Sequence, residues 1–99
     1  MAYQIEFAKL VKAHLEVLTA GQRSTVLDVI ERQLTNEPSK ETRNRKPLRP
    51  NPVAPWELRM GELRVFYEVS EGPPALVRIL AVGVKVRETL RIGGQEIKL

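Results

Sequence analysis

Residues 56–69 decide the fold, and their sequence is WELRMGELRVFYEV. Apolar and polar residues alternate on both sides of Gly61-Glu62, and alternation around a short glycine-containing turn is typical of a β-hairpin. The second run divides its side chains between two faces, with Leu63, Val65, Tyr67 and Val69 on one and Arg64, Phe66 and Glu68 on the other. We therefore predict two paired strands with one face directed toward a core.

Upstream of the hairpin, residues 3–7 alternate with period two, which predicts a strand with one buried face. From residue 8 the spacing becomes helical, with apolar residues on one stripe: Val11, Leu15 and Leu18. Thr19 and Gln22 match a capping box, so a second helix is expected to begin there. The sequence Asn36-Glu37-Pro38 ends that helix, because proline disfavours helical geometry in the residue before it.

Residues 37–55 differ in kind, because they hold five of the seven prolines. Basic side chains stand between these prolines: Lys40, Arg43, Arg45, Lys46 and Arg49. Proline fixes φ and lacks an N–H donor, so the segment is expected to be a basic loop without a helix interior or a central strand. Loops of this length are functional or disordered, and both interpretations stay open here.

After the hairpin, residues 75–82 are apolar at nearly every position, as expected of a central strand, and Gly83 is expected to end it. The remainder is charged, with Gly93-Gly94 predicted as a turn before a last short extended piece. The order β-α-α-β-β-β predicts one α+β domain spanning residues 1–99. In it, two N-terminal helices pack on one face of a mostly antiparallel twisted sheet, and the other face stays partly open.

Composition excludes several classes of protein. The chain of 99 residues has no cysteine and one histidine, so disulfides, thiolate nucleophiles and a histidine-based metal site or triad are not expected. We expect no metal and no cofactor. No apolar stretch approaches the roughly 20 residues that span a bilayer, and no signal segment opens the chain, so we expect a cytoplasmic protein without a membrane partner. The net charge is +4, and the whole excess lies in residues 37–99. A basic half indicates either a polyanion or acidic protein partner, or a solvated face.

The candidate functional residues lie on the predicted open face of the hairpin. Arg59 and Arg64 could hold phosphate oxygens, and Phe66 could stack a base, which together would form a surface for single-stranded RNA. The alternative is that both arginines form ordinary surface salt bridges with nearby glutamates. Lys85 and Arg87 follow Gly83 and extend the basic bias, although a solvated tail would have the same composition. His14, on a helix flank with apolar neighbours, is interpreted as structural.

The hairpin also resembles a known family. Residues 56–69 are similar to the pattern Y-x-L-R-x-G-x-Y-R-V-x-Y-x-V of the RelE/ParE toxin superfamily. Residues 77–85, which end in AVGVK, resemble the last core strand of that superfamily, which ends in V-G-x-R/K. The opening strand, the helical pair and the basic loop follow in the same order, so the resemblance covers nearly the whole chain.

The resemblance implies the toxin of a type II toxin–antitoxin system, with an acidic antitoxin as its partner. RelE-like members are ribosome-dependent endoribonucleases that cleave mRNA without a metal and so inhibit translation. The resemblance makes Arg64, Arg59 and Lys85 the expected catalytic residues. By position, Arg64 matches the arginine that holds the scissile phosphate, Arg59 a basic position that contacts RNA and aids proton transfer, and Lys85 a phosphate-binding position. The loop cations would supply affinity for ribosomal RNA: Arg43, Arg45, Lys46 and Arg49.

Three positions depart from the RelE-like pattern. Glu57 replaces a catalytic lysine, Leu63 replaces an aromatic residue, and Arg91 falls where a substrate-orienting tyrosine is expected. Glu57 and the missing tyrosine favour a first alternative, a ParE-like toxin that inhibits DNA gyrase without cutting RNA. The retained Arg59, Arg64 and Lys85 favour the nuclease. A second alternative is a basic binding module that cuts nothing.

Overall fold

The computed structural model describes residues 2–99. Along the chain it contains β1 (Gln4–Phe7), α1 (Val11–Glu16), α2 (Ala20–Leu34), β2 (Arg45–Pro47), β3 (Trp56–Met60), β4 (Leu63–Ser70), β5 (Leu76–Val86), β6 (Thr89–Ile92) and β7 (Gln95–Ile97). In this range the strands form one sheet in the order β2-β3-β4-β5-β6-β7, and β1 pairs with β5. All pairs are antiparallel except β1 with β5. The predicted α+β class with a mostly antiparallel sheet is confirmed.

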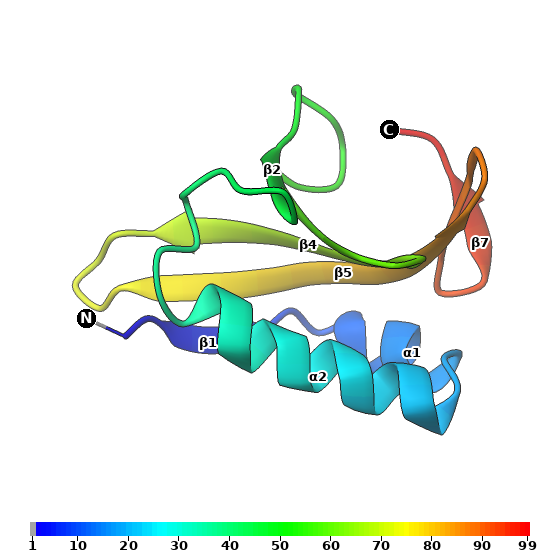
Figure 1. Cartoon of the computed structure of the whole chain (residues 1–99), viewed down its shortest axis with the longest axis horizontal. Helices are drawn as coiled ribbons and strands as arrows, with labels where there is room; N and C mark the ends of the chain where they lie inside the picture. Colours follow the sequence, from blue (N-terminus) through cyan, green and yellow to red (C-terminus); the bar gives the residue numbers. More distant parts are fainter. Residues whose placement is uncertain (1) are drawn as a thin grey trace.

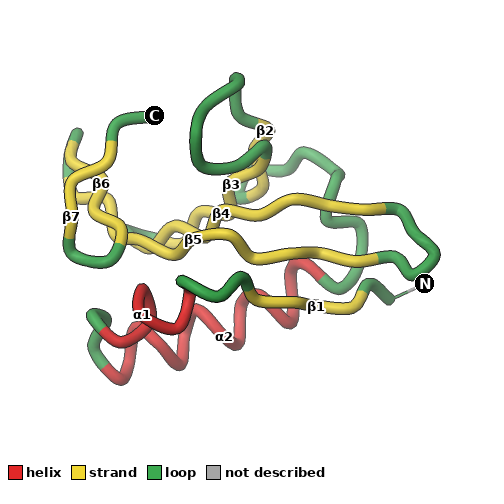
Figure 2. The backbone as a smooth tube through the Cα atoms, turned by 180° about the vertical axis from the view of Figure 1, so that it is seen from behind, coloured by secondary structure: helices red, strands yellow, loops and turns green. Residues whose placement is uncertain are grey.

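Both helices lie on one side of the sheet, below β4 and β5 in Figure 1. Figure 2 shows β1 running beside β5 with α2 beneath them. The main core lies between these layers: Val11, Leu18, Val26, Ile30, Leu34, Leu58, Leu63, Val65, Tyr67, Val77, Ile79 and Val82. Trp56 packs against this core, and its ring stacks on Tyr67 with centroids 6.0 Å apart. The division of faces predicted for the hairpin is therefore confirmed.

The face of the sheet away from the helices carries a second, smaller core, made of Ala54, Phe66, Ala81, Leu90 and Ile92. Residues from the loop before β3 and from the C-terminal strands pack over it: Leu48, Val53 and Ile97. In Figure 1 this loop and the β6–β7 hairpin rise on the side of the sheet opposite the helices. The face predicted to be partly open is thus covered at its centre by these two segments.

Local signals around α2 agree with the sequence. The Thr19 side chain accepts from the backbone N–H of Gln22, and the Gln22 side chain accepts from the backbone N–H of Thr19, so the predicted capping box is present. The helix before it is shorter than expected, because α1 begins at Val11 and not at residue 8, and it ends at Glu16, before Leu18. The chain stays extended to Phe7, and Ala8 donates a backbone hydrogen bond to Ile79.

Two details of the predicted strands were wrong. The proline-rich segment contains a short strand, β2, at the edge of the sheet. An edge strand tolerates Pro47 because no strand on its outer side needs a hydrogen bond from a backbone N–H at this position. The central strand does not end at Gly83 but continues to Val86, where β6 pairs with it. A β-carbon at Gly83 would lie 2.5 Å from the carbonyl oxygen of Arg91 and 2.9 Å from Cγ1 of Ile92. Gly83 therefore permits a close approach of β6 and does not terminate the strand.

Candidate functional site

The three residues expected to be catalytic come from three adjacent strands and share one face of the sheet. Arg59 on β3 lies directly opposite Arg64 on β4, and Arg64 lies opposite Gly83 on β5. Lys85 is two residues beyond Gly83 and therefore projects to the same side as Arg64. This is the face turned away from the helices. We call the surface formed by Arg59, Arg64, Lys85 and Glu57 the cationic face.

Arg64 is half-buried and is anchored to the turn of its own hairpin. Its Nη1 donates to the carbonyl oxygen of Gly61 at 2.6 Å and to that of Leu63 at 2.9 Å. Gly61 has a positive φ of 58°, which lets the turn present its carbonyl there. Nε and Nη2 of Arg64 make no hydrogen bond to another residue in the described range. The guanidinium is thus fixed on one side and keeps donors for a ligand on the other.

Arg59 is exposed, and its Nε donates to Oε1 of Glu57, two residues earlier on β3. Glu57 is only 5% exposed, because β2 and β4 flank it on the sheet and the second core lies beside it. A buried carboxylate requires a charged or hydrogen-bonding partner, and Arg59 supplies it. The alternative of a glutamate salt bridge is therefore correct for Arg59, whereas Arg64 bonds to carbonyl oxygens.

A cavity of about 310 Å³ borders the cationic face between the sheet and the C-terminal hairpin. Its lining contains both signs of charge: Glu57, Lys85, Glu88, Leu90, Glu96, Ile97, Lys98 and Leu99. The backbone N–H of Lys85 donates to the carbonyl oxygen of Glu62 at 2.7 Å, which ties this part of β5 to the turn between β3 and β4. The position of Lys85 is therefore set by backbone contacts, while its half-buried side chain faces the cavity.

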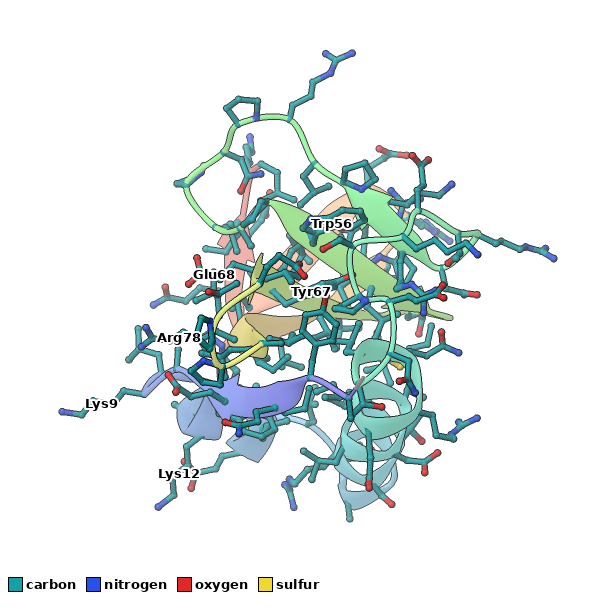
Figure 3. The ribbon with its side chains drawn as sticks, turned by 90° about the vertical axis from the view of Figure 1, so that its left-hand side faces the viewer. Lys9, Lys12, Trp56, Tyr67, Glu68 and Arg78 are labelled. Carbon is teal, nitrogen blue, oxygen red and sulfur yellow. The ribbon has the colours of Figure 1, made fainter. Side chains whose placement is uncertain are left out.

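Away from the hairpin turn the same face of the sheet loses its positive charge. Arg78 on β5 pairs with Glu6 at 3.5 Å and lies opposite Glu68 in the register of β4 and β5. Figure 3 shows Arg78 and Glu68 close together, with Lys9 and Lys12 projecting on the side of α1. Positive charge without a carboxylate partner is thus concentrated on this face near the turn that holds Arg64.

The basic loop divides into solvent-facing and structural cations. Arg43 and Arg49 are exposed, and Lys46 lies 3.6 Å from a carboxylate oxygen of Glu41. Arg45 instead points to the helical layer. Its Nη1 donates to the carbonyl oxygen of Gln33 at 2.8 Å and to Oε1 of Gln33 at 3.0 Å. The RNA-contacting role expected of Arg45 is therefore replaced by a structural one, in which Arg45 fastens the loop to the end of α2.

Two other expected RNA contacts lie elsewhere. Phe66 has no exposed surface, since its ring fills the second core, so the prediction that it stacks a base was wrong for this conformation. Arg87 is exposed in the turn between β5 and β6, at a positive φ of 57°. It lines a hollow of about 410 Å³ together with Arg91. Arg91 lies opposite Val84, on the helix side of the sheet, and is therefore not part of the cationic face.

His14 connects α1 to the sheet. Its Nδ1 accepts a hydrogen bond of 3.3 Å from the backbone N–H of Val82 on β5. Burial lowers the pKa of His14, because desolvation disfavours the charged imidazolium. The interpretation of His14 as structural agrees with this contact, because Val82 belongs to the main core.

The described residues offer neither a metal site nor a membrane-spanning helix. Across residues 2–99 no three side chains of His, Asp or Glu gather closely enough to hold a metal ion. Neither helix in that range has the length and apolar character that a membrane crossing requires.

The fold is a small α+β fold of the RelE/ParE type. The structure is similar to a chain of the crystal structure of the toxin–antitoxin complex RelBE2 from Mycobacterium tuberculosis. The TM-score is 0.74 at 25% sequence identity, over 86% of this chain and 93% of that one. No protein-family model and no curated protein matches the sequence. The resemblance drawn from the hairpin is confirmed: the chain has the fold of a RelE-like toxin.

Proposed function

We propose that this protein is the toxin of a type II toxin–antitoxin system and acts as a RelE-like, ribosome-dependent endoribonuclease that cleaves mRNA and inhibits translation. The similarity to a toxin–antitoxin complex supports the toxin assignment. The nuclease assignment rests on one observation, namely that Arg59, Arg64 and Lys85 come from three adjacent strands and share one face beside a cavity. Such an arrangement can hold a phosphodiester from more than one side.

The proposed reaction needs no nucleophile from the protein, because the RNA supplies its own. The 2′-oxygen attacks the adjacent phosphorus, the bond from phosphorus to the 5′-oxygen breaks, and a 2′,3′-cyclic phosphate and a 5′-hydroxyl result. The 2′-hydroxyl gives up a proton to a base, and the leaving 5′-oxygen gains one. Arg64 would contact the phosphate oxygens as negative charge develops on them, and Lys85 would add a second positive charge. Orienting the strand for in-line attack supplies the rest of the rate enhancement.

The partners follow from the same surface. Arg43 and Arg49 are exposed on the loop and would contact ribosomal RNA, and Lys46 and Arg87 would extend that contact. An acidic antitoxin segment that covers the cationic face would exclude RNA by charge and by bulk. Because the proposed activity requires ribosomes and mRNA, we expect it to take place in the cytoplasm.

The test is controlled expression of the full chain in cells without its antitoxin. We expect growth to stop, and we expect Arg64→Ala to restore it, since the shortened side chain cannot reach a phosphate. Arg32→Ala is the matched control, because Arg32 is exposed on α2, far from the face, and pairs only with Asp28. Mapping message ends in the arrested cells should show cuts within translated codons. Full toxicity of the Arg64→Ala variant would remove Arg64 from the mechanism.

One observation favours the ParE-like alternative. Glu57 holds a carboxylate on the cationic face where RelE-like enzymes carry a lysine, and it already binds one of the three expected cations. Arrested growth with intact messages and altered DNA supercoiling would support a gyrase target. Binding to RNA without arrest or cleavage would support a plain binding module.

A further inference from the structure

Glu57 has an unusual environment for a carboxylate. Within residues 2–99 it is the only charged residue in the buried class, at 5% exposure. It is the second residue of β3 and lies opposite Lys46 on β2 and Phe66 on β4. It also lines the cavity that contains Lys85. Burying a carboxylate costs free energy, so its one close contact calls for a functional explanation.

That contact fixes one edge of the Arg59 guanidinium. The Glu57 carboxylate accepts from Nε, and the side chain of Glu57 is 6% exposed whereas that of Arg59 is 47% exposed. Nη1 and Nη2 of Arg59 make no hydrogen bond to another described residue. An arginine held through Nε keeps both terminal nitrogens free, which can bind two oxygens of one phosphate.

The register adds a second reason for a negative charge at this point. Arg59 lies directly opposite Arg64, and like charges at opposite positions of an antiparallel pair repel each other. Arg64 is anchored separately, by the carbonyl oxygens of Gly61 and Leu63. A buried carboxylate beside Arg59 offsets the repulsion and keeps both guanidinium groups on the same face.

We propose that Glu57 is a positioning residue, which holds Arg59 through Nε so that Arg59 and Arg64 together grip a phosphate of an RNA strand. The inference rests on the proposed function for the identity of the ligand. The orientation of Arg59 is a property of the chain itself and can be measured without RNA.

The decisive variant is Glu57→Gln, which keeps the shape of the side chain and removes its charge. If Glu57 acted only by its charge, the variant would bind RNA more tightly, because a negative group is lost from the face. Positioning predicts the opposite sign. We expect cleavage of mRNA on programmed ribosomes to slow by roughly ten- to a hundredfold. We also expect weaker binding of a 2′-O-methyl RNA oligonucleotide, which cannot be cut.

Two further measurements separate positioning from simple stability. In the Arg59→Ala background, Glu57→Gln should no longer weaken cleavage or binding, because the guanidinium that Glu57 positions is already absent. The Nε–H of Arg59 should show a high heteronuclear NOE in the wild-type protein and a low one in Glu57→Gln. Glu62→Gln is the matched control for loss of charge, because Glu62 is exposed in the adjacent turn, and it should weaken neither cleavage nor binding and should leave the Arg59 NOE unchanged.

The outcomes are distinguishable. Unchanged or faster cleavage by Glu57→Gln, tighter RNA binding, or an unchanged Arg59 Nε–H signal would each overturn the proposal. A loss that is equally large in the Arg59→Ala background would also overturn it, because Glu57 would then act without Arg59. If the wild-type protein cuts no message, the proposed function fails, and the NOE and the binding of the uncleavable RNA still decide the role of Glu57.

Discussion

His14 is the titratable side chain that connects the helical layer to the central strand. The hydrogen bond from Val82 requires a neutral Nδ1, and burial lowers the pKa of His14 below its ordinary value of 6.5. A group with a lowered folded pKa contributes stability above its unfolded pKa and loses it as the pH falls through the folded value. Acidification below about pH 6.5 should therefore weaken the attachment of α1 to the sheet.

We predict that the free energy of unfolding falls between pH 7.5 and pH 5.5 and that His14→Gln reduces this fall. Urea titrations of both proteins at the two pH values measure the difference. Equal losses in the two proteins would show that the imidazole does not control this stability.

For single residues, the sequence predicted the face to which a side chain projects more reliably than its burial and contacts. Arg59 and Arg64 could be placed on one face because the strand period alone determines the side to which a residue projects. Lys85 could not be placed there, because the central strand was expected to end at Gly83, whereas it continues to Val86. The burial of Glu57 and Phe66 could not be predicted, since it depends on a loop and a hairpin that fold over them from distant parts of the chain. The direction of Arg45 depends likewise on Gln33, twelve residues away.

Among the elements, α2 carries the clearest local signal, its capping box. The hydroxyl oxygen of Thr19 accepts a hydrogen bond from the backbone N–H of Gln22, for which the helix itself offers no carbonyl oxygen. We predict that Thr19→Ala lowers the free energy of unfolding by about 1 kcal/mol. Thr25→Ala is the control, because Thr25 is exposed within the same helix and alanine is at least as favourable there. Chemical denaturation of the two variants measures the difference, and equal stabilities would contradict a role for the cap.

The hairpin of β3 and β4 was predicted with its observed boundaries because alternation and turn chemistry coincide there. Strands β2 and β6 were missed for different reasons. Strand β2 is three residues long and contains Pro47. Proline argues against a strand unless the strand lies at the edge of a sheet. Strand β6 follows a turn occupied by Arg87 at a positive φ, where glycine or asparagine would have been the expected sign.

For the molecule as a whole, the sheet separates two cores of unequal size. The smaller one joins the basic loop to the C-terminal hairpin through Phe66, which has no exposed surface. The packing of the basic loop and of the C-terminal hairpin against the sheet therefore depends on the Phe66 ring. A protein in which this core is weakened should keep its helices and lose the arrangement of its candidate site.

We predict that Phe66→Ala costs about 3–5 kcal/mol of unfolding free energy, as expected for a fully buried ring. Phe7→Ala is the control with the same chemistry, and its cost should be much smaller because Phe7 is 44% exposed. Urea denaturation compares them, and hydrogen exchange should show faster opening of β6 in Phe66→Ala. Equal stabilities of the Phe66→Ala and Phe7→Ala variants would contradict the structural role of Phe66.

The pairing of the first strand with the fifth has a consequence for synthesis. Gln4 lies opposite Leu76, and the other residues of β1 pair with residues of β5 that are equally far away in the sequence. During translation, β1 has no strand to pair with until β5 has left the ribosomal exit tunnel. Closing so large a ring is entropically slow compared with zipping a hairpin. The newborn chain therefore completes its sheet only after residues 76–79 have been synthesised.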